Sequence, residues 1–276
     1  MEFIIEPLQY GFILRGLIGG LFTAAACATL SAFVVWRGMS FMGDALAHSV
    51  LPGIVVAYIL GISLLWGALG AASFVVIGIG LISSKGNLRE DTAIGVVFTG
   101  FFALGILMLS RVATFSDLSH ILFGNILGVS TQDLIMMAVV TVIVIAGTFL
   151  SFKEIVTASF DPAHSTAIGL SPALVRYIVL IMLALTTVVA IQTVGVVLVL
   201  ALLVTPGASA SLVSRRLPSI IGLSLLLAGL ATIIGFYVSF YIDLSSGPSI
   251  VLALTAEFLI CILIRKIKLK NVKKPI

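Results

Sequence analysis

Residues 218–242 read PSIIGLSLLLAGLATIIGFYVSFYI, and no charged side chain interrupts them. The run is longer than the roughly 20 apolar residues that a helix needs to cross the hydrocarbon core of a bilayer. A strand of a membrane barrel would instead show a shorter segment in which apolar and polar residues alternate. The stretch therefore predicts a membrane-spanning α-helix.

Similar runs occupy most of the chain. Of its 276 residues, 61% are hydrophobic and only 9% are charged, which is too few charges to coat a soluble domain. The runs can be counted as nine spans or as eight. The count is open because only Gln192 to Gly195 separate two of the runs, and because Gly61 and Ser63 follow directly after another. The predicted fold class is an all-α polytopic membrane protein, a helical bundle of eight or nine transmembrane helices in a single domain over residues 1–276. The nine predicted spans are 12–36, 45–62, 64–83, 92–111, 133–151, 173–191, 194–214, 218–242 and 248–265.

Basic residues indicate which side of the membrane each loop occupies. The first run, 12–36, is too long for a cleavable signal peptide and is read as a retained span. The tail from Arg265 to Lys274 carries much of the net charge of +4, and such a tail marks the cytoplasmic side. With nine spans, most other basic loops fall on the same side, at Arg37, Lys85 and Arg89, residues 153–172, and Arg215 and Arg216. We therefore expect a cytoplasmic C-terminus, and the charge requires no nucleic acid.

The sequence GDALAH at residues 43–48 enters the second predicted span. Asp44 and His48 are four residues apart, so a helix would place both side chains on one face, where both could bind one divalent cation. Ionisable residues within a membrane are costly and are functional candidates for that reason. In the alternative interpretation, Asp44 caps a helix N-terminus and His48 is hydrogen-bonded to it. The residues alone leave both interpretations open.

The chemical types of the two candidate ligands limit which metal ions the site could bind. A carboxylate and an imidazole suit manganese, iron or zinc, whereas a copper(I) site would use thiolates. Cys27 and Cys261 lie in apolar runs and are interpreted as packing residues. Two ligands are too few for tight binding, which fits a path from which an ion must also leave. Water or a second copy of the chain could complete the metal's coordination shell.

A second candidate element lies in the long loop between residues 152 and 172. Asp161 is expected to cap a short helix, Pro162 to open it and Gly169 to close it. Such a helix could dock a soluble partner or simply connect two spans. His164 is expected to lie on its surface.

Four further features are weaker signals. Glu257 lies well inside the last span and must be protonated, hydrogen-bonded or facing water, so it is a possible path-lining residue. His120 belongs to an external segment, 117–133, that could form a short helix on or in the membrane surface. Residues 89–92 are expected to begin a helix. The sequence contains no P-loop motif and no nucleophile–base pair, so we expect no enzymatic activity, no catalytic residue and no cofactor-binding residue.

Four stretches together resemble the ABC-type manganese/zinc/iron permease family, and the resemblance runs nearly from end to end. The most specific stretch has the family's pattern G-D-A-x-x-H-x-x-x-P-G at residues 43–53. The others are Glu90 to Gly95, Phe160 to Leu170, and Val194 to Pro206.

The resemblance implies a fold of the metal or metal-chelate ABC importer type in the bacterial cytoplasmic (inner) membrane. It implies a homodimer, two cytoplasmic ABC ATPase subunits, an extracytoplasmic metal-binding receptor, and alternating access driven by ATP that the partner hydrolyses. Asp44 and His48 would then line the translocation path as metal ligands. The metal would be a substrate and not a resident cofactor, with manganese as first choice, zinc second and iron possible. The residues that would couple the permease to the ATPase are Phe160, Asp161, Pro162, Ala167, Gly169 and Leu170.

An ion-coupled secondary metal transporter is the alternative function. In that case Asp44, His48 and Glu257 would form a proton relay, and no ATPase would be needed.

Overall fold

The computed structural model describes residues 6–85, 90–111 and 126–272. Within these ranges nine helical segments are long and apolar enough to cross a membrane, so the prediction of nine spans is confirmed and the alternative of eight is wrong. One span is made of two consecutive helices, α3 and α4. The spans are α2 (Gly11–Trp36), α3 (Met42–Ser49) with α4 (Leu51–Leu60), α5 (Leu64–Lys85), α6 (Glu90–Leu109), α8 (Thr131–Leu150), α11 (Pro172–Val194), α12 (Val196–Val213), α13 (Leu217–Ile242) and α14 (Ser246–Val272).

Four short elements connect the spans. The 3-10 turns η1 (Pro7–Gln9) and η2 (Ile126–Gly128) precede α2 and α8, and α9 (Phe152–Phe160) and α10 (Pro162–Ala167) lie between α8 and α11. The predicted external segment is therefore described only from Ile126 onward. His120 and Arg89 lie outside the described residues.

Most span boundaries differ from the prediction by a few residues, and three regions show the differences that matter for the fold. The second span begins at Met42 and not at residue 45, so Asp44 lies inside the helix. Only Gly195 separates α11 from α12, with φ 84° and ψ 163°, a conformation that glycine adopts readily because it has no Cβ. The last helix continues to Val272, because the basic tail extends α14 beyond its apolar part.

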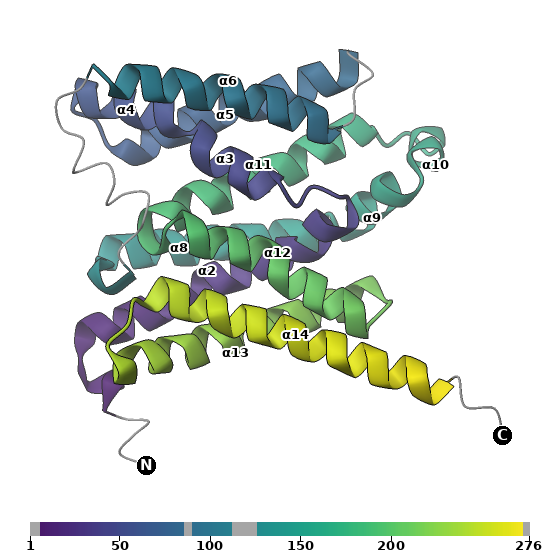
Figure 1. The fold of residues 1–276 in the computed structure, drawn as a ribbon. Coiled ribbons are helices and arrows are strands. Elements are labelled where there is room, and N and C mark those ends of the chain that lie inside the picture. Colours follow the sequence, from purple (N-terminus) through teal and green to yellow (C-terminus); the bar gives the residue numbers. More distant parts are fainter. Residues whose placement is uncertain (1–5, 86–89, 112–125, 273–276) are drawn as a thin grey trace.

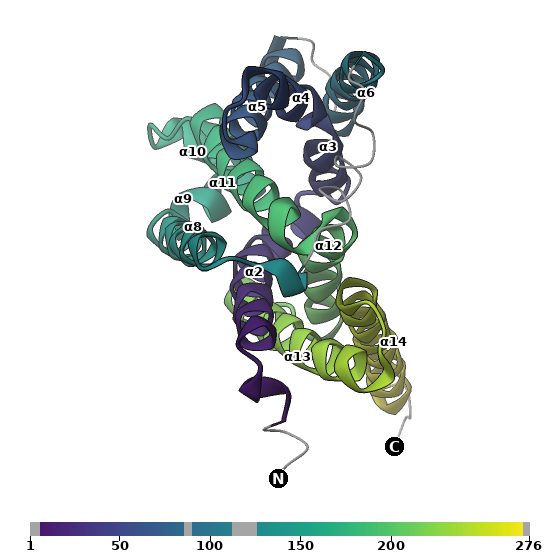
Figure 2. The same cartoon turned by 90° about the vertical axis from the view of Figure 1, so that its left-hand side faces the viewer.

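Helix α2 lies at the centre of the bundle and is the most buried span. It packs against α8, α11, α12 and α13. Helices α4, α5 and α6 form a group on one side, which α11 and α3 join to the rest, and α13 and α14 form the opposite side (Figures 1 and 2). The helix that carries Asp44 and His48 thus lies between the α4–α6 group and α12.

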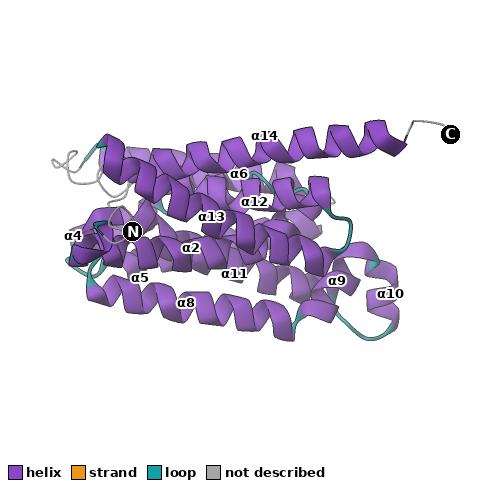
Figure 3. Cartoon of the chain, turned by 90° about the horizontal axis from the view of Figure 1, so that it is seen from below, coloured by secondary structure: helices purple, strands orange, loops and turns teal. Residues whose placement is uncertain are grey.

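The spans run alternately in opposite directions. Viewed from below, α9, α10 and the end of α14 lie at one end of the bundle, while the link between α4 and α5 lies at the other (Figure 3). We call the first of these the basic end, because it carries Lys153, Arg215, Arg216, Lys266 and Lys268. These basic residues therefore share one end of the bundle, and the side of the membrane that this end occupies stays a prediction.

Two close helix crossings depend on small residues. Gly53 on α4 and Gly67 on α5 approach so closely that a Cβ on either would collide with the carbonyl group of the other. Pro206 lies inside α12, and the Ser31 hydroxyl of α2 accepts a hydrogen bond from the Gly207 N–H at 2.8 Å. A side chain from a neighbouring helix thereby bonds to the backbone beside the proline.

Candidate functional site

Helix α3 places Asp44 and His48 on one face. Oδ1 of Asp44 lies 3.3 Å from Nε2 of His48, as the spacing of four residues predicts. Their side chains are 26% and 30% exposed, whereas the other residues of α3 are buried. Within the described part of the chain, the pair therefore lies on the partly exposed face of α3.

The neighbours of α3 hold this face in place. The imidazole of His48 packs edge-on against Phe102 of α6, with ring centroids 5.2 Å apart, and Phe98 stacks on Phe102. On the α12 side, Gly43 lets the helix approach Leu203 so closely that a Cβ at Gly43 would lie 2.9 Å from the leucine Cδ1. The rings and the close approach restrict rotation of α3, so the pair is held in a fixed orientation.

A helix break follows the pair directly. Helix α3 ends at Ser49 and α4 begins at Leu51. Pro52 has no N–H, so the carbonyl of His48 cannot receive the hydrogen bond that residue 52 would give it in a continuous helix. The His48 carbonyl instead accepts a hydrogen bond from the N–H of Val50, the residue between the two helices.

The capping interpretation of Asp44 fits the structure less well. Asp44 is the third residue of α3, and the N-cap position belongs to Phe41, whose side chain makes no capping hydrogen bond. The carboxylate lies in the first turn, where the helix dipole favours it, but it is directed to His48.

The spacing of the two ligand atoms suits a shared metal ion. Ligands about 2.0–2.2 Å from a first-row metal, at angles of 90–110°, lie about 3.0–3.5 Å from each other. The 3.3 Å between the Asp44 oxygen and the His48 nitrogen falls in this range. In the described part of the chain no group of three or more His, Cys, Asp or Glu residues could hold a metal. The pair therefore offers one carboxylate and one imidazole in the described part of the chain.

Glu257 does not join this pair. It lies on α14, which packs against α12 and α13, while α3 packs against the other side of the bundle. Its Oε2 is buried and has no hydrogen-bond partner among the described residues. The role of Glu257 in lining a path stays a prediction.

The short helix α10 forms as its sequence predicts. The Asp161 carboxylate accepts a hydrogen bond from the His164 N–H at 2.8 Å, Pro162 is the first helical residue, and Gly169 has φ 82° just after the end. His164 is exposed, as expected. The sequence analysis missed α9, which precedes α10 and packs against it.

The exposed side of α9 and α10 is partly apolar. The side chains of Phe160 and Ile168 are more than half exposed, and Trp36 packs edge-on against Phe160 with centroids 5.0 Å apart. Of the other predicted coupling residues, Asp161, Pro162, Ala167 and Gly169 are exposed and Leu170 is half-buried. The surface lies at the basic end of the bundle, beyond the spans (Figure 3).

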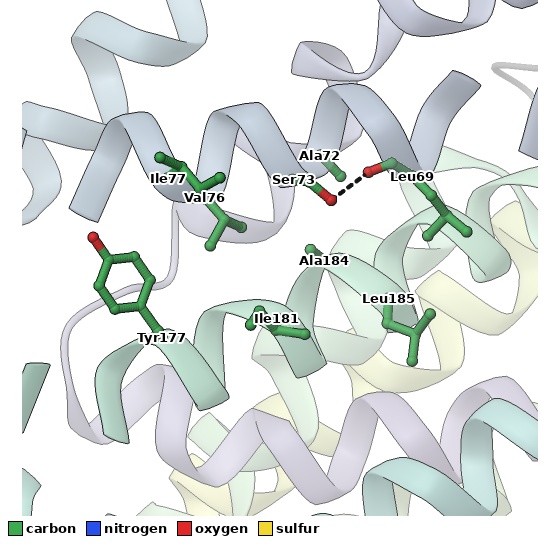
Figure 4. A pocket seen from close by; sticks show the side chains of 9 residues that line it. All are labelled: Leu69, Ala72, Ser73, Val76, Ile77, Tyr177, Ile181, Ala184 and Leu185. Carbon is green, nitrogen blue, oxygen red and sulfur yellow. Dashed lines mark hydrogen bonds between the residues drawn. The ribbon is translucent and has the colours of Figure 1, made fainter. Parts of the chain in front are cut away.

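An apolar groove of about 270 Å³ runs between α5 and α11 (Figure 4). Its only polar side chains are those of Ser73, which donates to the Leu69 carbonyl at 2.8 Å, and Tyr177. No carboxylate or imidazole lines it, so we do not regard it as a metal site. The lining residues are Leu69, Ala72, Ser73, Val76, Ile77, Tyr177, Ile181, Ala184 and Leu185.

These features define a class: a polytopic helical membrane protein with a carboxylate–imidazole pair on a partly exposed face of one span. Residues 9–265 match the ABC 3 transport family, and the chain belongs to that family. The resemblance drawn from the four sequence stretches is thereby confirmed.

Relatives cover the chain almost completely. It is 39% identical over 269 residues to a probable iron transport system membrane protein of Haemophilus influenzae, covering 98% of this chain and 99% of that one. It is 41% identical over 262 residues to a manganese transport system membrane protein of Synechocystis, covering 95% and 86%.

Solved structures agree on the fold. PsaBC from Streptococcus pneumoniae in complex with Fab superposes with a TM-score of 0.82 at 34% identity, covering 94% of each chain. A metal-chelate type ABC transporter in an inward-facing conformation gives a TM-score of 0.69 at 16% identity, covering 91% and 85%, and shows the fold alone. The predicted fold class is therefore confirmed.

Proposed function

We propose that this chain is the membrane permease of an ATP-driven importer for divalent transition-metal ions. The observation that carries the proposal is the Asp44–His48 pair, 3.3 Å apart on the partly exposed face of α3. Membership of the ABC 3 transport family and the relatives named for manganese and iron transport support it. Manganese is the first choice and iron the second, while zinc rests only on the chemistry of the ligands.

In this proposal two copies of the chain form a homodimer. The pair in one chain supplies only two side-chain ligands, and a second pair from the partner copy would give four. The partly exposed face of α3 supports this arrangement, because the side chains of Asp44 and His48 remain 26% and 30% exposed. Alternating access would expose the shared ion first to one side of the membrane and then to the other.

The energy and the metal would reach the permease through other proteins. Two cytoplasmic ATPase subunits would bind the surface formed by α9 and α10, and an extracytoplasmic receptor would deliver the ion at the opposite end of the bundle. The basic end supports a cytoplasmic C-terminus in a bacterial cytoplasmic membrane, because positively charged loops stay on that side. The permease would have no enzymatic activity of its own.

Metal binding to the purified dimer tests the site. Mn²⁺ should bind with one ion per two chains, detected as loss of the free-ion signal in electron paramagnetic resonance. Asp44→Asn and His48→Gln should each weaken binding at least tenfold, whereas Asp243→Asn should not. Asp243 is a suitable control, because it is an exposed carboxylate with φ 55° that asparagine tolerates. One ion per single chain would show that the shell is completed in another way.

A secondary carrier is the alternative function. The buried Glu257 oxygen without a hydrogen-bond partner in the described residues favours it, because such a carboxylate can carry protons. Transport by that route would follow a proton gradient and would not require ATP.

A further inference from the structure

A second apolar groove lies at the basic end, between the end of α8 with the start of α9 on one wall and the start of α13 on the other. Both α8 and α13 pack against α2, which lies between them (Figure 2). The groove has a volume of about 290 Å³. Its lining residues are Phe149, Phe152, Lys153, Pro218, Ile221, Gly222 and Leu225, of which only Lys153 is charged.

The groove crosses the boundary between the membrane and the aqueous phase. Helix α8 ends at Leu150 and α13 begins at Leu217, so Lys153 and Pro218 lie at the edge of the spans. Leu225 lies about 10 Å deeper along α13, because each helical residue advances about 1.5 Å. The groove is therefore polar at its mouth and apolar along its depth, as a phospholipid molecule is.

One cation lines the mouth, and two more directly precede the helix that forms the opposite wall. Lys153 lines the mouth, and Arg215 and Arg216 immediately precede the first turn of α13, which contains Pro218. All three side chains are exposed, and none forms an ion pair within the described part of the chain. The acid next in sequence, Glu154, is half-buried and is not among the lining residues. Lys153, Arg215 and Arg216 thus outnumber the one neighbouring acid, and no ion pair among the described residues neutralises them.

We propose that this groove binds one acidic phospholipid, with its phosphate at Lys153, Arg215 and Arg216 and the first part of an acyl chain along Ile221 and Leu225. A basic pocket between spans at the cytoplasmic side is a recurrent way to hold such lipids. The apolar lining favours an acyl chain over water, and the three cations select an anionic headgroup over a neutral one. Binding there would stabilise the contact of α9 and α13 with the bundle next to the α9–α10 surface.

Gly222 offers a way to fill the groove. A Cβ at this position meets nothing within 4 Å, so a larger side chain has room and would occupy the groove. A Cβ at Gly229 on the same helix also meets nothing within 4 Å, but Gly229 does not line the groove, which makes Gly229→Leu a matched control.

The test is native mass spectrometry of the purified full chain with phosphatidylglycerol or phosphatidylcholine of identical acyl chains. The wild-type chain should retain one phosphatidylglycerol in preference to phosphatidylcholine. Gly222→Leu should reduce that retention at least fivefold, and Gly229→Leu should leave it unchanged. Neutralising Lys153, Arg215 and Arg216 to glutamine should reduce the headgroup preference by about fivefold per charge.

Three outcomes would overturn the proposal: equal retention of both lipids, unchanged retention by Gly222→Leu, or loss of the dimer or of the ATPase by these variants while lipid retention stays constant. The last would assign the groove to a protein contact. If Gly222→Leu does not fold, the test depends on the variant in which Lys153, Arg215 and Arg216 are replaced by glutamine.

Discussion

The crossing of α4 and α5 at Gly53 and Gly67 gives a prediction whose size follows from the structure. A Cβ built at Gly53 lies 2.7 Å from the Cβ of Ala71 and 2.8 Å from the carbonyl carbon of Gly67, whose oxygen is nearer still. Carbon atoms in contact normally lie about 3.5–4.0 Å apart, so Gly53→Ala must move the two helices apart by at least ~0.7 Å. Such overpacking costs about 1–3 kcal/mol.

Unfolding of the purified chain in mixed micelles with increasing SDS measures this cost. We expect Gly53→Ala to lower the free energy of unfolding by about 1–3 kcal/mol. Gly70→Ala is the control, because Gly70 lies one turn along α5 from Gly67 and a Cβ there meets nothing within 4 Å. Alanine at that position should leave stability equal to or above that of the wild type. Equal stability of Gly53→Ala and Gly70→Ala would refute the close crossing.

Three further substitutions test other parts of the bundle. Ser31→Ala removes the hydroxyl that accepts from the Gly207 N–H at 2.8 Å, and the same SDS titration should show a loss of about 0.6–1.7 kcal/mol. No loss would contradict the role of Ser31 in binding the α12 backbone beside Pro206. Gly195→Ala forces a Cβ into φ 84°, ψ 163°, and should cost about 1–3 kcal/mol; a stable variant would show that α11 and α12 join differently. Asp161→Ala removes the N-cap of α10 and should reduce co-purification of the ATPase at nearly unchanged global stability, while Asp161→Asn, which keeps a capping oxygen, should retain it. Equal loss with both Asp161 variants would show that the charge and not the cap matters.

Hydrophobic runs were enough to predict the spans, because hydrocarbon leaves a chain few ways to satisfy its backbone groups. The start of the second span was misplaced by three residues. Asp44 and its neighbours read as a polar boundary, whereas packing of α3 against Phe98 and Phe102 keeps the helix intact through Asp44. A hydropathy scale treats a carboxylate as unfavourable in the membrane. It does not include the stabilising contacts that a neighbouring helix provides.

The candidate site was predictable only where its geometry is local. The spacing of Asp44 and His48 fixes their proximity, and the Asp161–Pro162 pair fixes the start of α10. Contacts between helices leave no such periodic signal. Gly53 could be recognised as part of the family's pattern, but that it packs against Gly67 follows only from the crossing of α4 and α5.

Metal uptake into proteoliposomes is the most direct test of the central proposal. The permease would be reconstituted with its ATPase and receptor, and ATP-dependent accumulation of manganese, iron and zinc compared for the wild type, Asp44→Asn and the control Asp243→Asn. We predict ATP-dependent uptake, of manganese first, that Asp44→Asn abolishes and Asp243→Asn preserves. Uptake that ignores ATP and follows a proton gradient would contradict the proposal and favour a secondary carrier.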